Sequence, residues 1–557
     1  MAKTGQLLPT AIGTASPNIA KYPQQGGWYP YSVSIVNSLG GGKVKRGNNQ
    51  PVANVIKGQL LPCYFNDFYF RVHVVPTAID MGNVVTSQQY EIYVWNAHFI
   101  NKRLNAITGV TEGIVLEGQS APAVINALKE LLYKITITPE GSSIIDDSIV
   151  WDFNEELPSI HITGNRIIAF SFMPNWADSV QERLEWATDI LTSETGVEQR
   201  SALYVAPRRY FTASFIVHGR ERQLFNNMAS WHAKNWAMPL WHYIDFIKQP
   251  IVSGDTTIHC NTNFIEFKVG GLVFLWRDEF TYEIAEIAAI NSDNLQVKRP
   301  LQSEWPAGTR VYPAITAIFN NVPSLKRYND QLQETSIEFR AAEVNSYNAA
   351  TPSLNYKNYP VFTLLPDESE NLTSSYQQIL ATLDNGMALP LVTDTANNRF
   401  IVQGYRFLGF GRAEHAAYRA FLYYLNGQQK AVWIPSHADD LTILGDVSNI
   451  DTSLVIAQCG YTRFAQTDTD KKYLFIRLTD GSIYCRTVLS SSNDGDTERL
   501  LLDEPFNRAI TAKEFERVSY MRLSRLNDDS VTIKHITDSE GAATSSITFK
   551  RVLDNEL

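Results

Sequence analysis

Two stretches of the chain, about 200 residues apart, share one pattern. The first reads Phe215-Ile216-Val217-His218-Gly219-Arg220-Glu221, and the second reads Phe407-Leu408-Gly409-Phe410-Gly411-Arg412-Ala413-Glu414. In each, an apolar run enters a glycine and then a helix-like sequence. Glycine adopts backbone conformations that other residues avoid, so Gly219 and Gly411 allow a sharp turn from strand to helix. We therefore predict the same strand, turn and capping helix at two places.

Further landmarks keep one order in both copies, which is typical of an internal duplication. In the first copy they are residues 172–176, 236–239, 295–300 and 336–340, and in the second they are residues 364–367, 432–435, 501–505 and 546–550. The opening of each copy also predicts a helix, over residues 178–191 in the first and 374–383 in the second.

The region after the first capping helix predicts a small inserted β-barrel or sandwich. Short alternating runs occur at residues 272–276, 282–285, 295–297 and 310–312. We assign residues 169–350 to a first module and residues 351–557 to a second, related module. Each is predicted to be a helix over a mainly antiparallel sheet.

The part of the chain before the modules divides into two. Residues 68–75 and 90–95 alternate β-branched and aromatic residues at period two, so residues 61–168 predict a β-sandwich. Residues 1–60 are rich in glycine, proline and asparagine and cannot bury much surface alone. They predict an extended N-terminal arm.

Composition limits the classes of function. A formal net charge of -10 disfavours a nucleic-acid-binding surface. The cysteines Cys63, Cys260, Cys459 and Cys485 are too scattered for a disulfide framework or a zinc site, so we expect free thiols. No apolar run is long enough for a membrane span or a signal peptide, which predicts synthesis in the cytosol.

No motif for catalysis or cofactor binding stands out, and we predict no catalytic, cofactor-binding or metal site. The run Gly40-Gly41-Gly42-Lys43 lacks the Ser or Thr and the strand of a phosphate loop. Ser436, His437, Asp439 and Asp440 are the residue types of a hydrolase triad, but neighbours on one loop cannot form its geometry.

Histidines and carboxylates give weak signals only. His218, His232 and His242 are the densest histidine group, and His415 and His437 in the second copy lie at different offsets, so we expect aromatic packing. Glu182 and Glu185 would lie side by side on the exposed face of the predicted helix rather than across a glycosidase cleft. Aromatic residues make up 11% of the chain and favour cores and interfaces over sugar platforms.

Several segments carry a resemblance to bacteriophage proteins. Residues 186–193, 196–200, 202–203 and 207–208 resemble an opening in tail proteins of long-tailed (siphovirus-type) phages and prophages, and the strand, helix and aromatic-proline order resembles the module of distal tail and baseplate hub proteins. Residues 75–82 and 88–96 are similar to Ig-like domains of such virion proteins. Distal tail proteins usually carry one copy of the module, whereas this chain carries two.

The resemblance implies a mainly β, multidomain fold, with an Ig-like β-sandwich followed by two related β-sandwich or barrel modules, each with a short capping helix. It implies a virion structural protein of the phage tail tip, assembled in the host cytoplasm, with no enzymatic activity and no cofactor. Its partners would be further copies of itself, in a ring of six or a pseudo-sixfold ring of three, and tail tube, hub and tail fibre proteins. The alternatives are a receptor- or carbohydrate-binding fibre or adhesin and a glycan-cleaving tail enzyme.

Overall fold

The computed structural model describes residues 68–84, 87–139, 144–229, 235–387, 389–394, 399–409, 411–538 and 541–553. The predicted N-terminal arm and the run Gly40-Gly41-Gly42-Lys43 lie outside these residues. Strands dominate the described chain, so the mainly β, multidomain fold class is confirmed. Two compact units are distinguished, of which the first ends along the chain at Phe170 and takes in two short later segments.

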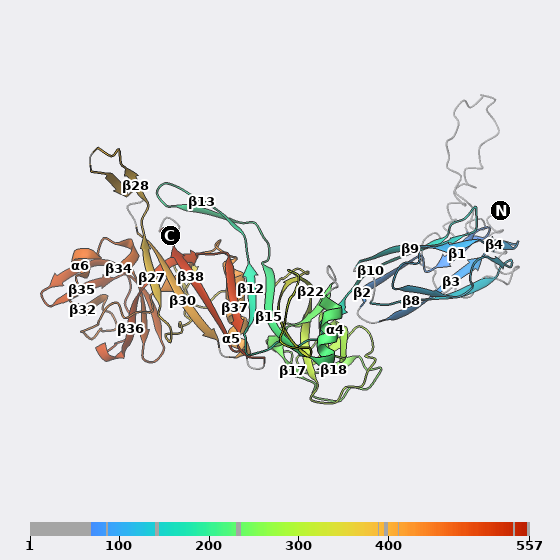
Figure 1. Ribbon diagram of the computed structural model, residues 1–557. Helices are drawn as coiled ribbons and strands as arrows, with labels where there is room; N and C mark the ends of the chain where they lie inside the picture. Colours follow the sequence, from blue (N-terminus) through green and yellow to red (C-terminus); the bar gives the residue numbers. More distant parts are fainter. Residues whose placement is uncertain are drawn as a thin grey trace, which may run out of the picture. The chain divides into compact units, whose positions relative to one another are not determined.

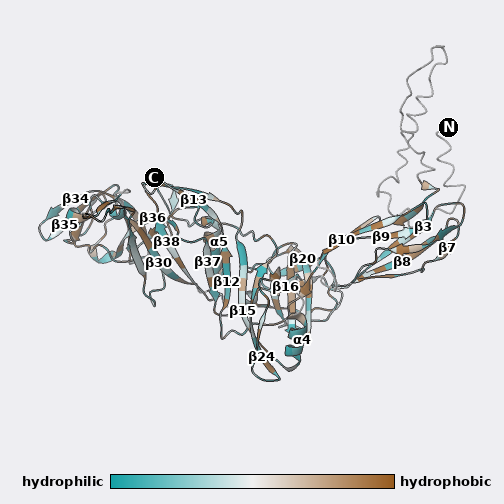
Figure 2. Ribbon diagram, turned by 45° about the horizontal axis from the view of Figure 1, so that its top comes forward, coloured by the Kyte–Doolittle hydropathy of each residue, from teal (hydrophilic) through white to brown (hydrophobic). Residues whose placement is uncertain are grey.

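Unit 1 is a β-sandwich of two four-stranded sheets. One sheet has the order β1 (Val72–Val75), β3 (Gln88–Asn96), β8 (Glu130–Ile137) and β6 (Ile114–Glu117), and the other has the order β2 (Ala78–Val84), β10 (Ser159–Arg166), β9 (Ile144–Asp152) and β5 (Ala106–Thr108). A small pair, β4 (Lys102–Leu104) and β7 (Ala123–Ile125), accompanies them. Figure 2 shows brown apolar residues alternating with paler ones along β8, β9 and β10. This alternation buries Tyr133, Ile149 and Ile160 between the sheets.

Unit 2 contains two sets of strands on either side of residue 350, which we call the first module and the second module (Figure 1). The first module holds β12 (Val180–Glu185), β13 (Thr188–Thr192), β14 (Glu198–Ala202), β15 (Arg208–His218), α4 (Gly219–Ala229), β18 (Thr257–His259), β19 (Leu272–Asp278), β20 (Thr281–Ile290), β21 (Asn294–Val297), β22 (Arg310–Phe319), β23 (Ser324–Arg327) and β24 (Leu332–Ala341). The boundary at residue 350 stays a prediction.

The second module has an element in the place of each of these. In the same order they are β27 (Thr373–Gln377), β28 (Leu380–Leu383), β29 (Leu391–Asp394), β30 (Phe400–Gly409), α5 (Arg412–Leu425), β32 (Ser453–Ala457), β33 (Tyr473–Leu478), β34 (Ile483–Asp494), β35 (Thr497–Leu502), β36 (Phe515–Leu526), β37 (Ser530–His535) and β38 (Ala543–Arg551). The aromatic-proline runs become β16 (Trp236–Pro239) and β31 (Val432–Pro435).

Strand pairing agrees between the modules down to the register. In the first module β15 pairs β24 with Tyr210 opposite Arg340, and in the second β30 pairs β38 with Val402 opposite Lys550. A register shift interrupts β20–β21 in the first module, and another interrupts β34–β35 in the second. Both modules are therefore built to one plan of antiparallel pairs.

The glycines act as the sequence predicts. Gly219, at φ +53°, opens α4, and Gly411, at φ +96°, immediately precedes α5. Both capping helices are confirmed, because α4 begins at the residue after β15 ends and α5 begins at Arg412, shortly after β30 ends at Gly409.

The two other predicted helices are wrong. Residues 178–191 form β12 and β13, and residues 374–383 lie in β27 and β28. In β12, Val180, Glu182 and Leu184 are buried while their neighbours are more exposed, which is the period of a strand. Pairing on both edges of β12 outweighs the helix-favouring Gln, Glu and Arg residues.

Candidate functional site

The joint between the two modules is the most distinctive site in unit 2. Strand β12 of the first module pairs with β15 on one edge and with β37 of the second module on the other, both antiparallel. The register across the joint places Glu182 opposite Ile533 and Val180 opposite His535. One sheet thus continues from module to module.

A buried ionic cluster lies at this joint. The Glu182 carboxylate accepts hydrogen bonds from Arg209 Nε at 2.5 Å, from both terminal nitrogens of Arg419 at 2.7 and 2.5 Å, and from His535 Nε2 at 2.9 Å. Glu266 receives a two-pronged bond from Arg209 at 2.7 and 2.8 Å. The side chains of Glu182, Arg209 and Arg419 are 0% exposed, so the charges are fully removed from water.

The cluster is close to electrically neutral, because two carboxylates face two guanidinium groups. Burial is the largest single influence on the pKa of Glu182 and would raise it, but the charges of Arg209 and Arg419 together with the hydrogen bonds hold that pKa well below its usual range. Glu182 is therefore ionised at neutral pH. A complete buried pair of this kind changes the free energy of unfolding little. Removal of one partner lowers that free energy strongly, because the other charge is left buried and unpaired.

Three histidines line the same cluster. The His242 ring stacks on the His535 ring with centroids 3.7 Å apart, and the His415 ring lies 5.2 Å from that of His535. Burial lowers the pKa of both His242 and His415 well below the usual value, so both rings are neutral. Among the described residues, neither ring nitrogen of His242 has a hydrogen-bond partner.

Glu182, His242 and His535 offer potential metal-ligand atoms within 4.8 Å of one another. Ligands of one ion converge on it, so two imidazole rings would have to aim their nitrogens at a common point. The rings lie 12° from parallel instead, and guanidinium groups already occupy both oxygens of Glu182. A divalent cation would also add positive charge beside Arg209 and Arg419. The geometry favours a buried network of ion pairs and hydrogen bonds that stabilises the joint, rather than a metal centre.

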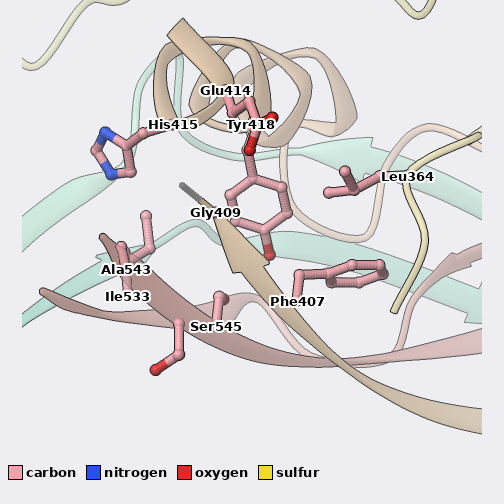
Figure 3. A pocket seen from close by; sticks show the side chains of 10 residues that line it. Leu364, Phe407, Gly409, Glu414, His415, Tyr418, Ile533, Ala543 and Ser545 are labelled. Carbon is pink, nitrogen blue, oxygen red and sulfur yellow. The ribbon is translucent and has the colours of Figure 1, made fainter. Parts of the chain in front are cut away.

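A cavity of about 30 Å³ lies beside the cluster, within the second module. Figure 3 shows the Tyr418 ring reaching from α5 toward the strands that carry Phe407 and Ser545, with His415 to one side and Leu364 to the other. Such a volume holds about one water molecule, not a substrate.

The β13–β14 hairpin forms a second contact across the joint. Glu198 bonds Arg525 through both carboxylate oxygens at 2.6 and 2.8 Å, and its side chain is 4% exposed. Val197, at the hairpin tip, packs with Phe400 and Leu553 of the second module. The stretch Gly196-Val197-Glu198 therefore fastens one module to the other.

At the base of the same hairpin, Asp529 accepts hydrogen bonds from the backbone amide and the hydroxyl of Thr188, at 2.7 and 2.8 Å, and from the Gln428 amide at 3.0 Å. Gly427 fits closely among these groups, because an added Cβ would lie 2.7 Å from Trp186 Cβ. The joint is therefore closed by backbone, ionic and apolar contacts together.

Other residues singled out in the sequence are scattered. His218 is exposed, and His232 lies outside the described residues. Ser436 donates to Asp440 at 2.5 Å instead of meeting His437, whose ring lies near Tyr405 and whose pKa burial lowers to about 4. Among the described tryptophans, Trp176 and Trp276 are half-buried and the others are buried.

The expectation that Glu182 and Glu185 share an exposed helix face is wrong. Both lie on β12, where Glu182 is buried and the Glu185 side chain is 29% exposed. A usable signal was the alternation of Val180, Glu182 and Leu184, which puts a carboxylate in an apolar position and so predicts a buried cation beside it. Arg419 and His535 come from distant parts of the chain, and no local pattern identifies them.

Among the described residues, neither α4 nor α5 nor any shorter helical turn is long and apolar enough to cross a lipid bilayer.

No protein-family model matches the chain, and no curated protein matches it. Among solved structures, a similar chain is a secreted serine protease, VesC, from Vibrio cholerae, with 9% sequence identity and a TM-score of 0.14. The match covers 47% of this chain and 49% of the protease chain, so it spans about half of either. A likeness of this strength says nothing about the fold or the activity of the present chain.

Proposed function

We propose that the chain is a non-enzymatic structural subunit of a bacteriophage tail tip, whose copies form a ring around the tail channel and connect the tail tube to the hub and fibres. The observation that carries this proposal is the fusion of two modules of one plan through a continuous sheet at β12 and β37. Rings are built by repeating one contact between like modules, and this chain contains one such contact within itself.

The chemistry of the joint supports a structural role. Glu182 and Glu266 are saturated by guanidinium groups, and the cavity beside them is too small for a substrate. The resemblance of residues 186–208 to phage tail proteins adds to this, because Glu198 and its neighbours in that stretch hold the modules together.

The proposal is tested by light scattering of the purified protein at several concentrations, followed by negative-stain imaging. We expect rings of three or six copies with a central hole. A monomer at all concentrations would overturn the proposal, and binding of surface glycans by that monomer would favour a receptor-binding role.

A further inference from the structure

The two modules differ in whether another strand pairs with their outer strand edges. In the first module β12 is paired on both edges, by β15 and by β37. Its counterpart in the second module, β27, pairs with β30 and with no other strand of the described chain. Likewise β37 is covered by β12, while its counterpart β23 pairs, within the described residues, with β24 alone.

The open edges have the registers of the closed joint. Glu182 faces Phe211 in β15, and Ser374 faces Gln403 in β30, so Ser374 holds the place of Glu182. Ile533 faces Ser545 in β38, and Leu325 faces Thr335 in β24, so Leu325 holds the place of Ile533. The joint pairs Glu182 with Ile533, and the same plan would set Ser374 opposite Leu325 of another copy.

Both open edges expose apolar side chains that a lone chain would leave in water. All residues of β27 and of β23 are exposed. On the second module the exposed group continues onto the β28–β29 hairpin and comprises Tyr376, Leu380, Leu383, Met387, Leu389, Leu391 and Val392. On the first module it comprises Val322, Leu325 and Tyr328. Exposed apolar side chains beside an unpaired strand edge favour pairing with another strand.

The β28–β29 hairpin repeats the β13–β14 hairpin in register, since Leu380 faces Asp394 as Thr188 faces Ala202. It therefore carries Leu389 and Pro390 where the first hairpin carries Val197 and Glu198. On the receiving side, Ile318 faces Arg340 as Arg525 faces Lys550. An apolar contact between Pro390 and Ile318 would thus replace the ion pair between Glu198 and Arg525. A two-stranded hairpin is marginal alone, so such cover would stabilise it.

We propose that a second copy of this chain docks head to tail, with β27 of one copy pairing antiparallel to β23 of the next and the β28–β29 hairpin lying over the neighbour's first module. The inference names the contact of the ring proposed above and rests on that function for the use of repeated copies. Charge is compatible with a like partner, because Lys326 and Arg327 on β23 would lie toward Glu368 and Glu370, which pair with Arg517 and Arg406 of their own module but keep side chains 58% and 62% exposed.

Disulfide trapping tests the register. The variant Ser375→Cys/Ser324→Cys, with Cys63 and the exposed Cys459 both replaced by serine, puts cysteines at facing positions of β27 and β23, within disulfide reach. Under mild oxidation we expect a ladder of linked chains in denaturing gels. The matched control is Ser375→Cys/Leu325→Cys, because a slip of one residue turns the two side chains to opposite faces of the sheet.

Each outcome decides the inference. A ladder from the facing pair and none from the slipped pair supports it, and equal ladders from both overturn the register. Rings seen in negative stain without a ladder from the facing pair overturn this inference and leave the proposed function standing. A ladder that builds open filaments supports strand docking and overturns the ring. Neither ladder nor ring at any concentration overturns both.

Discussion

The carboxylate of Glu182 balances the buried charges at the joint and therefore contributes strongly to the free energy of unfolding. The Glu182→Gln substitution leaves Arg209 and Arg419 with Glu266 as their only anionic partner in the cluster, in a site that is 0% exposed. We expect the free energy of unfolding to fall by about 3–5 kcal/mol, the usual effect of an uncompensated buried charge. Chemical denaturation followed by circular dichroism measures it.

Glu185→Gln is the matched control, because Glu185 lies on the same strand and its ion pair with Arg183 at 2.8 Å is partly exposed. Glu185→Gln should lower the free energy of unfolding by less than about 1 kcal/mol. Adding Arg419→Gln to Glu182→Gln restores charge balance, so the double variant should lose less than the sum of the single losses. Simple additivity would mean that the two charges are not coupled.

The buried histidines predict a loss of stability in acid. Burial depresses the pKa of His242 and His415, so below the unfolded pKa of about 6.5 the unfolded chain binds more protons than the folded chain. Stability then falls as pH decreases, by up to about 1.4 kcal/mol per pH unit for each ring. Glu182, whose folded pKa is also depressed, adds to the loss only below its unfolded pKa of about 4.5.

His242→Phe keeps an aromatic ring on His535 and removes one titrating group. We expect the variant to show a smaller slope of unfolding free energy against pH between about 6.5 and 4.5. Denaturation curves at half-unit steps of pH measure this, and the region above pH 7.5 serves as the internal reference. An unchanged slope would show that His242 does not contribute to the pH dependence.

At the scale of elements, the sequence predicts what local chemistry controls. The capping helices follow from Gly219 and Gly411, whose positive φ values permit the turn, and the strands at 272–276 and 310–312 follow from their β-branched and aromatic residues. Residues 178–191 could not be placed this way. β12 pairs with β15 on one edge and with β37, about 350 residues away, on the other, and β13 pairs with β14. The strand state of these residues therefore depends on partners outside the segment.

Gly427 lies at a close contact within the joint. A Cβ at this residue would meet Trp186 and the Asp529 carboxylate, and φ is +69°. Gly427→Ala should therefore cost more than backbone strain alone, about 2–4 kcal/mol in unfolding free energy. Gly495, at φ +76° with nothing within 4 Å, is the matched site where Ala should cost about 1–2 kcal/mol. Equal losses at both sites would argue against close packing at Gly427.

The β13–β14 hairpin should loosen when its ionic contact is removed. Glu198→Ala takes away both bonds to Arg525, so we expect amide exchange in β13 and β14 to become roughly tenfold faster while β15 stays protected. Hydrogen exchange with mass spectrometry measures this. Glu194→Ala, an exposed residue on the same hairpin, is the control, and equal acceleration by both variants would exclude Glu198 as the fastening residue.

At the scale of the whole molecule, the chain contains one completed joint and the two unmatched halves of another. The completed joint uses buried charge, with Glu182, Arg209 and Arg419 at 0% exposure. The unmatched edges carry Ser374 and Leu325 in the corresponding places and are exposed, with Tyr376 and Leu325 among polar residues on the strands and a larger apolar group on the β28–β29 hairpin. A contact within one chain forms once, during folding, and tolerates buried ions. A contact between chains forms by collision, and apolar cover of this kind suits it.

The two proposed docking surfaces, the β28–β29 hairpin and the β23 edge, can be disabled separately by mutation. Leu389 is 94% exposed and Leu325 is 44% exposed, so Leu389→Asp and Leu325→Asp should leave the melting temperature within a few degrees of the parent and weaken self-association at least about 30-fold. Light scattering and sedimentation measure the association. Ile450→Asp, at a residue 79% exposed and away from both edges, should associate like the parent.

Mixing the two variants tests the direction of assembly. Each retains one intact end, because Leu389→Asp spares the β23 edge and Leu325→Asp spares the hairpin. A head-to-tail contact joins the intact hairpin of one variant to the intact edge of the other, so the mixture should form dimers and stop there. A symmetric contact, in which each copy offers the same surface twice, would be disabled in every pairing of these variants or would survive in one variant alone. Dimers that appear only on mixing therefore distinguish directional docking from a two-fold pair.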